Sequence, residues 1–257
     1  MNNTNIRGVI FDYGGTLDTR GDHWSEVIWD GYCQCSMTVD KQAYRDAYVY
    51  GERALAVNPI VTPEFHFIDI LREKLKLQLQ FLCGRQLMPT GKDDNERQAQ
   101  LATRLEMSDE EIELTAQNIA NNINNATNNL LCENRQVLER LRQAGLPMVL
   151  VSNFYGNIKT VLRDAHLDGY FKDIVESAVV GVRKPNPAIF ALGVCALDLP
   201  ASEVLVVGDT YSKDIVPAHK LGCHTIWIKG KQWEEKTSDE NICDAVITQL
   251  DQMLKYV

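Results

Sequence analysis

The sequence predicts an α/β protein in which a mostly parallel sheet lies between two layers of helices, with an all-helical segment inserted near its start. Two observations carry this prediction. Apolar runs with strand character alternate with helical patterns after about residue 145, whereas residues 20–129 show helical spacing and no strand alternation. Strands and helices that alternate along a chain form a parallel sheet covered on both faces. We therefore expect a core from residues 1–19 and 130–257 and a helical domain from residues 20–129.

The first predicted strand, Ile6–Asp12, is a short apolar run that ends in an acidic residue. Gly14 and Gly15 follow, and paired glycines after an apolar run indicate a tight turn. In an open parallel sheet, ligands bind at the carboxyl ends of the strands. Asp12 is therefore a candidate for the functional site.

Residues 20–129 have a different character. Trp24–Tyr50 and Pro63–Leu82 are charged, amide-rich segments whose apolar residues recur at helical spacing. The stretch Asn118–Asn129 holds seven asparagines, which predicts an exposed helix face and a turn rather than a functional tract. A short amphipathic helix is then expected to begin at Glu133 and to end at Gly145.

Strands and helices alternate through the rest of the chain. The carboxyl ends of two of these strands carry Ser152 and Asp209, which we expect to lie beside Asp12. The predicted strands are Pro147–Ser152, Ile174–Ser177, Val204–Asp209, His224–Lys229 and Ala245–Thr248, and the predicted helices are Ile158–Ala165, Pro187–Leu197 and Ser212–Leu221.

Composition and charge narrow the classes of function. With 26 Lys and Arg against 35 Asp and Glu, the net charge is −9 and the pI is near 5.1, so nucleic acids and anionic membrane surfaces are expected to be repelled. No apolar run approaches the roughly 20 residues that span a bilayer, and Met1–Asn5 lacks a basic region followed by an apolar stretch, so a cytoplasmic protein is expected. The seven cysteines show no framework of paired spacings and are interpreted as reduced thiols.

Four segments follow, or lie between, the predicted core strands. Each residue alone has a structural explanation, such as a helix cap, a turn or a surface charge, but four such segments in order are improbable by chance. They resemble motifs one to four of the haloacid dehalogenase superfamily, and the helical insert between motifs one and two resembles the first subclass of that superfamily. The segments are Phe11-Asp12-x-Gly14-Gly15-Thr16-Leu17, Val151-Ser152-Asn153, Arg183-Lys184-Pro185-x-Pro187 and Val207-Gly208-Asp209-x₄-Asp214.

The resemblance implies a Rossmann-like core with a helical cap domain, and an enzyme that hydrolyses a small phosphorylated metabolite. Asp12 would be the nucleophile, because a carboxylate can attack phosphorus and form an aspartyl-phosphate. The implied cofactor is Mg²⁺, a hard cation that holds carboxylates and phosphate oxygens together. Its implied ligands are the Asp12 carboxylate, the backbone carbonyl of Gly14 and Asp209, with Asp214 binding through water or orienting the others.

The remaining motif residues are implied to handle phosphate. Lys184 would balance the negative charge of the nucleophile and the phosphate, and Ser152 and Asn153 would donate hydrogen bonds to phosphate oxygens. Four residues of the nucleophile loop and the start of the insert are candidate substrate contacts, with a hinge and ordinary packing as the alternative for the last three: Thr16, Arg20, His23 and Trp24.

One position departs from the family pattern. Phosphatases of this superfamily normally carry a second aspartate two residues after the nucleophile, where this chain has Gly14. That aspartate protonates the leaving oxygen, and a positioned acid or base is worth roughly 10²–10⁴ in rate. A phosphatase would then borrow its acid from Asp18, from His23 or from the cap, or would use substrates with good leaving groups.

Three further hypotheses remain open. The first is a carbon–phosphorus hydrolase, because a family that resembles this chain has a small residue at the position of Gly14 and uses a cap lysine to form a Schiff base. Lys74 and Lys76 are available for that role, although a lysine on a helix is usually a solvated surface residue. Haloacid dehalogenation also needs no leaving-group acid, but the Gly-Asp-x₄-Asp segment around Asp209 argues against it. A catalytically weak protein that senses a phosphorylated ligand is consistent with Gly14.

Overall fold

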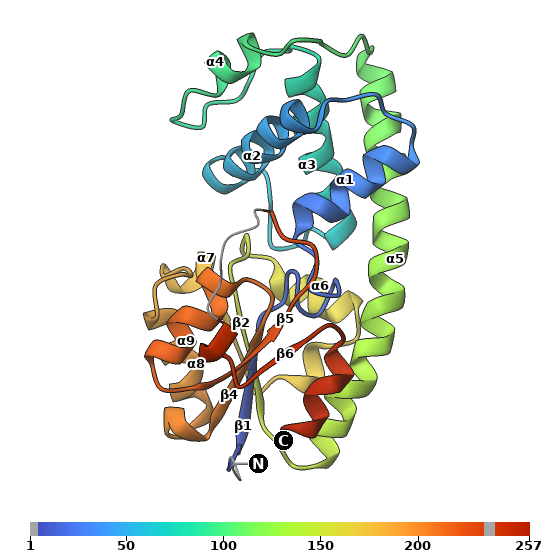
Figure 1. Ribbon diagram of the computed structural model, residues 1–257. Coiled ribbons are helices and arrows are strands. Elements are labelled where there is room, and N and C mark those ends of the chain that lie inside the picture. The colour runs from blue at the N-terminus through green and yellow to red at the C-terminus, as the bar shows by residue number, and fades with distance from the viewer. Residues whose placement is uncertain (1–4, 234–239) are drawn as a thin grey trace. The chain divides into compact units, whose positions relative to one another are not determined.

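The computed structural model describes residues 5–233 and 240–257. The chain divides into two compact units, a core unit of Met1–Glu26 with Thr127–Val257 and a helical unit of Val27–Ala126. The sequence places these boundaries at residues 20 and 129. Two helices, α1 (Trp24–Gln34) and α5 (Asp109–Gln143), contain residues of both units (Figure 1). The unit boundaries therefore fall within helices, and they differ by several residues from the boundaries expected from the sequence.

The core unit is built on a six-stranded sheet in which every neighbouring pair is parallel, as the sequence predicts. The strand order is β3-β2-β1-β4-β5-β6, so β1 lies between β2 and β4 and all three carboxyl ends meet at one edge. The strands are β1 (Gly8–Phe11), β2 (Met148–Ser152), β3 (Asp173–Glu176), β4 (Val204–Gly208), β5 (His224–Ile228) and β6 (Ala245–Ile247).

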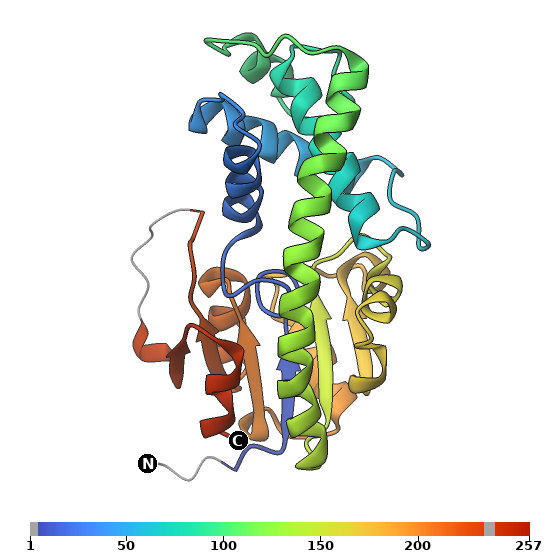
Figure 2. The ribbon, with the colours of Figure 1, turned by 90° about the vertical axis from the view of Figure 1, so that its right-hand side faces the viewer.

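Strands β1, β2 and β4 are buried along their whole length, which is why their sequences are continuous apolar runs rather than alternating ones. Helices cover both faces of the sheet, with α8 (Ala188–Leu197) and α9 (Val216–Lys220) on one side and the last turns of α5 on the other (Figures 1 and 2). Helix α8 approaches closely because Gly193 presents no side chain to Val151 and Ile10, where a Cβ would lie 2.8 and 3.0 Å from their methyl groups.

The sequence-based expectation of a turn within Asn118–Asn129 and a short helix from Glu133 is wrong, because α5 is one helix of 35 residues. Asparagine costs a helix only a few tenths of a kcal/mol relative to better helix formers. Burial of an apolar stripe at three- and four-residue spacing outweighs that cost, and the asparagines face outward at the positions between. The buried apolar residues of this helix are Ile112, Ala116, Ile119, Ala120, Ile123, Leu131, Val137, Leu138 and Leu141.

The helical unit also contains α2 (Lys41–Val57), α3 (Phe67–Leu82) and α4 (Asp94–Ala99), in agreement with the absence of strand patterns there. Asp40 caps the start of helix α2, because its carboxylate accepts hydrogen bonds from the backbone N–H groups of Gln42 and Ala43. Tyr32 and Tyr44 pack edge to face, with ring centroids 5.3 Å apart, in the interior of this unit. No helix among the described residues is long and apolar enough to cross a membrane.

Candidate active site at the carboxyl edge of the sheet

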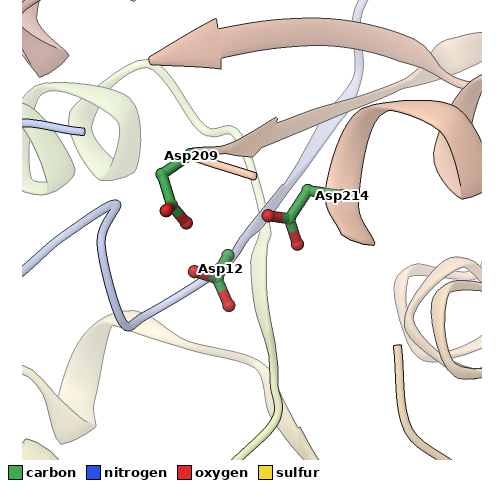
Figure 3. A group of neighbouring side chains, drawn as sticks. All are labelled: Asp12, Asp209 and Asp214. Carbon is green, nitrogen blue, oxygen red and sulfur yellow. The ribbon is translucent and has the colours of Figure 1, made fainter. Parts of the chain in front are cut away.

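Three acidic side chains meet at the edge where β1 and β4 end. Asp12 follows β1, Asp209 follows β4, and Asp214 lies in the π-helical turn Tyr211–Ile215 that leads into α9. One carboxylate oxygen from each lies within 4.8 Å of the others, and all three side chains are buried (Figure 3). The structure therefore brings together the three aspartates that the sequence singles out.

Lys184 joins this cluster from the loop between α7 (Ser177–Val180) and α8. Its Nζ lies 2.6 Å from Oδ1 of Asp12 and 2.7 Å from Oδ1 of Asp214, and its side chain is 2% exposed. The ring of Phe190 lies beneath the ammonium, with its centroid 5.2 Å from Nζ. The lysine is thus held between the residue that follows β1 and the turn that follows β4.

The backbone of Lys184 is fixed by Asn153, which follows β2. The Asn153 side chain donates from Nδ2 to the Lys184 carbonyl at 3.1 Å and accepts at Oδ1 from the Lys184 N–H at 2.9 Å. This pair of contacts gives Asn153 a positioning role that the sequence did not predict. Ser152, the last residue of β2, is 1% exposed at the same edge of the sheet.

The cluster carries three carboxyl groups against one ammonium, and burial makes this imbalance costly. Burial and the neighbouring Asp214 raise the pKa of Asp12 to about 6, although Lys184 acts to lower it. Burial, then Asp214 and Asp12, raise the pKa of Asp209 well above its usual range. Burial acts to lower the pKa of Lys184, but the two carboxylates outweigh burial and the pKa rises. Such a site binds either protons or a cation.

The oxygen-only donor set suits a hard divalent cation such as Mg²⁺. Asp214 has both oxygens engaged, because Oδ1 accepts from Lys184 and Oδ2 accepts from the backbone N–H of Thr210 at 3.0 Å. The Asp209 carboxylate accepts from the Thr210 hydroxyl at 3.1 Å, and its backbone carbonyl accepts from Trp227 Nε1 at 2.6 Å. The Trp227 and Thr210 contacts have no sequence motif that predicts them.

The loop after Asp12 is shaped around the cluster. Gly15 has φ of 100° and a Cβ at this position would overlap the Asp209 carboxylate, so glycine is required there. Thr16, which the sequence offers as a substrate contact, donates from its hydroxyl to Oδ2 of Asp12 at 3.2 Å. Thr16 is fully buried and therefore orients the Asp12 carboxylate.

Asp18 and Trp24 form a second polar contact beside this loop. Oδ1 of Asp18 accepts from the backbone N–H of Gly15 at 2.6 Å, and Oδ2 accepts from Nε1 of Trp24 at 3.1 Å. Burial is the main cause that raises the pKa of Asp18 to about 8, and the two N–H donors oppose the shift. The sequence names Asp18 as one possible acid, and the structure shows an enclosed carboxyl group, 2% exposed.

Two other predicted substrate contacts have partners elsewhere in the core unit. Arg20 is exposed and pairs with Glu133 at 2.8 Å, and it lines a cavity whose described lining residues include none of the acidic cluster. His23 contacts the Ser25 hydroxyl through Nδ1 at 2.8 Å, and its ring lies 5.8 Å from that of Trp233. The backbone N–H of His23 also donates to the Lys231 carbonyl, which ties this segment to the loop after β5.

The family model for haloacid dehalogenase-like hydrolases matches residues 6–222, which include every residue of the cluster. The chain belongs to the haloacid dehalogenase-like hydrolase family. The resemblance inferred from the four motifs is therefore confirmed at the level of the family.

Several curated relatives of this hydrolase are named as phosphatases. The glyceraldehyde 3-phosphate phosphatase of Pyrococcus furiosus is 33% identical over 126 residues, which are 48% of this chain and 52% of that protein. The phosphoglycolate phosphatase of Vibrio parahaemolyticus is 31% identical over 125 residues, 48% of this chain and 54% of that protein. The matched region therefore spans about half of the length of these relatives.

Solved structures of the family share the fold of this hydrolase along its length. A dehalogenase in an intermediate complex superimposes with a TM-score of 0.61 at 17% identity, over 98% of this chain and 97% of that one. The magnesium-bound HAD-hydrolase YfnB of Bacillus subtilis gives a TM-score of 0.54 at 17% identity, over 98% of each chain. At this level of identity, the two matches establish the fold.

Proposed function

We propose that this hydrolase is a Mg²⁺-dependent phosphatase that acts on a small phosphorylated metabolite through an aspartyl-phosphate on Asp12. The observation that carries the proposal is the buried cluster of Asp12, Asp209 and Asp214 around the Lys184 ammonium. The phosphatase names of the curated relatives support it. Phosphoryl transfer needs an in-line nucleophile and positively charged groups that neutralise the negative oxygens of the phosphoryl group. This cluster offers both.

The carboxylates of Asp12 and Asp209, together with the backbone carbonyl of Gly14, would hold Mg²⁺, because all three are hard oxygen donors. Asp214 would bind the metal through water or orient the other ligands, and its hydrogen bonds with Lys184 and Thr210 hold its carboxylate in place. When bound, Mg²⁺ neutralises charge on the phosphoryl oxygens. The magnesium bound to YfnB, which shares this fold, supports the choice of metal.

Each residue of the site then has its own role in phosphoryl transfer. Asp12 attacks phosphorus, and the P–O bond to the leaving group breaks. Lys184 offsets the charge of the nucleophile and phosphate, in a position that Asn153 maintains through its two hydrogen bonds to the lysine backbone. Ser152, at the end of β2, donates its hydroxyl hydrogen bond to a phosphate oxygen. Residues 20–129 act as a cap that excludes water and selects the substrate.

The carbon–phosphorus hydrolase hypothesis needs a neutral lysine amine to form a Schiff base. Lys74 is ion-paired with Glu52 at 2.5 Å within the helical unit. Lys76 pairs with Glu113 at 3.0 Å, and the hydrogen bond from Glu113 raises the pKa of Lys76. Both contacts favour the charged ammonium over the neutral amine. Phosphate monoester hydrolysis therefore remains the better proposal.

Phosphate release from 4-nitrophenyl phosphate tests the proposal. We expect turnover that depends on added Mg²⁺, is lost in EDTA and is lost in Asp12→Asn, while Asp168→Asn, an exposed residue on the core unit, retains it. Mg²⁺-dependent binding of inorganic phosphate with no turnover of any phosphate ester would instead favour a sensor. Turnover that survives Asp12→Asn would contradict the proposed nucleophile.

A further inference from the structure

Gly14 is a glycine that the backbone does not require. Its φ lies outside the left-handed region, and the atoms nearest to a Cβ built there are Cδ1 and Nε1 of Trp24, both at 3.7 Å, an ordinary van der Waals distance. The neighbouring Gly15 differs, because its positive φ and its closeness to Asp209 exclude any side chain. The backbone at position 14 therefore accepts a Cβ, and neither backbone conformation nor crowding of that atom explains why glycine stands there.

The position over Gly14 is accessible and is bordered by an aromatic ring. Within Phe11–Thr19, every residue is buried except Gly14, and Trp24 is itself partly exposed. The Trp24 indole is held in place because its Nε1 donates to Asp18, whose other oxygen accepts from the backbone N–H of Gly15. Any group that lies over Gly14 would therefore meet the edge of an anchored indole.

Asp18 does not replace the missing acid by geometry. Its two carboxylate oxygens both accept N–H hydrogen bonds, one from the loop backbone and one from Trp24, and its side chain is enclosed. Neither Gly14 nor Asp18 thus offers a proton to a leaving oxygen from this loop, so a leaving group that is stable as an anion departs most readily from it. Glycine at position 14 therefore favours leaving groups that are stable as anions, and the neighbouring indole edge suits flat apolar ones.

Resting on the phosphatase function proposed above, we propose that the substrates are small aryl phosphates and that Trp24 is the specificity-determining residue that contacts the aryl ring. Asp12 attacks phosphorus, the P–O bond to the aryl group breaks, and the bonding electron pair leaves on the aryl oxygen as a phenolate, which takes a proton from solvent. Water then attacks phosphorus, the bond to Asp12 breaks, and its electron pair returns to the carboxylate. Both protons of that water remain on the product, H₂PO₄⁻.

Three substrates have leaving groups of similar size that differ in their stability as anions: 4-nitrophenyl phosphate, phenyl phosphate and cyclohexyl phosphate. The measured quantity is kcat/KM, which reports the steps up to the first phosphoryl transfer and is not masked by slow hydrolysis of the aspartyl-phosphate. We expect 4-nitrophenyl phosphate to be fastest and cyclohexyl phosphate slowest. Gly14→Asp should raise kcat/KM for cyclohexyl phosphate by about 10² or more, the usual contribution of a positioned acid, and change it least for 4-nitrophenyl phosphate.

Two variants of Trp24 test the ring contact. Trp24→Ala should lower kcat/KM for phenyl phosphate by roughly three- to tenfold, the usual worth of an aromatic pair, and leave cyclohexyl phosphate within about twofold. Trp24→Phe keeps a ring but loses the hydrogen bond to Asp18, and should retain the preference for phenyl phosphate. If Trp24→Phe behaves as Trp24→Ala does, the Asp18 hydrogen bond rather than the ring is responsible, and the proposed contact is overturned.

The outcomes distinguish this inference from the function on which it rests. Equal kcat/KM for phenyl and cyclohexyl phosphates, with turnover that requires Asp12, would leave the phosphatase in place and overturn the aryl phosphate proposal. That result would mean that another group supplies the proton. Absence of Mg²⁺-dependent turnover on all three substrates would overturn both proposals.

Discussion

Lys184 and Asp214 form a buried ion pair in which Nζ lies 2.7 Å from Oδ1 and each side chain is 2% exposed. The same ammonium lies 2.6 Å from Oδ1 of Asp12, so a single positive charge connects the residue after β1 with the turn after β4. Asp209 adds a further carboxyl group to the cluster. The carboxyl edge of the sheet therefore has an excess of potential negative charge that protons or a cation must offset.

Replacement of Lys184 by Met should destabilise the metal-free protein by about 3–5 kcal/mol, because it leaves buried carboxylates uncompensated. Urea unfolding measures this change. The matched control is Lys229→Met, whose ammonium pairs at the surface with Glu240 at 2.6 Å with both side chains about half exposed. Its loss should cost no more than about 1 kcal/mol. Equal effects of the two substitutions would contradict the burial argument.

Mg²⁺ should raise the free energy of unfolding of the wild-type protein, by about 2.7 kcal/mol at a concentration one hundred times its Kd. Thermal unfolding with and without Mg²⁺ measures the shift. Asp209→Asn should abolish it, whereas Asp168→Asn should leave it intact. Since burial raises the pKa of Asp12 to about 6, protons compete with the metal and the stabilisation should grow as pH rises through 6. A shift that is independent of pH and of Asp209 would contradict this site.

Asn153→Ala should lower kcat by about tenfold, because it frees the backbone of the lysine that balances the developing charge. Lys184 acts to lower the pKa of Asp12, so a displaced ammonium should also move the acidic limb of the kcat/KM profile to higher pH. A purely structural role for Asn153 would leave that limb in place. Asn153→Asp retains the acceptor for the Lys184 N–H but cannot donate to the Lys184 carbonyl, so its kcat should also fall below that of the wild type.

Asp18 should make the metal-free protein less stable as pH rises from about 4 to about 8. Burial raises the pKa of Asp18 to about 8 in the folded state, above its ordinary value of 3.8. The folded state thus holds a proton that the unfolded state releases, and its stabilisation is present in full at low pH and is lost across this window. Asp18→Asn removes the ionisation, so the difference in unfolding free energy between the two proteins should change with pH. A constant difference would show that Asp18 is ionised in the fold.

The sequence predicts the sheet and its acidic edge because both depend on periodicity. Apolar runs locate the strands. Because the strands are parallel, Asp12, Ser152 and Asp209 come to one edge of the sheet independently of loop conformation. The asparagine-rich part of α5 is harder to predict, because its local composition favours a turn although the apolar stripe continues through it. Tertiary burial determines a helix of that length more than propensity does.

The contacts that refine the site depend on loop conformation, which has no periodic signature. The hydrogen bonds from Asn153 to the Lys184 backbone join residues 31 positions apart. The approach of Trp24 to Gly14 likewise depends on how the chain enters α1. The sequence predicts Asn153 as a phosphate contact and Trp24 as a substrate contact. It does not predict that Asn153 binds the Lys184 backbone or that Trp24 lies beside Gly14, because residue spacing carries no signal for either contact.

The most direct test of the central claim is an acid quench of the enzyme during turnover of ³²P-labelled phenyl phosphate in Mg²⁺, followed by peptide mapping. We predict a labelled acyl phosphate on the peptide that contains Asp12, absent from Asp12→Asn and absent when Mg²⁺ is withheld. Phosphate release from the wild-type enzyme with no label on that peptide, and undiminished release by Asp12→Asn, would contradict the claim that Asp12 is the nucleophile.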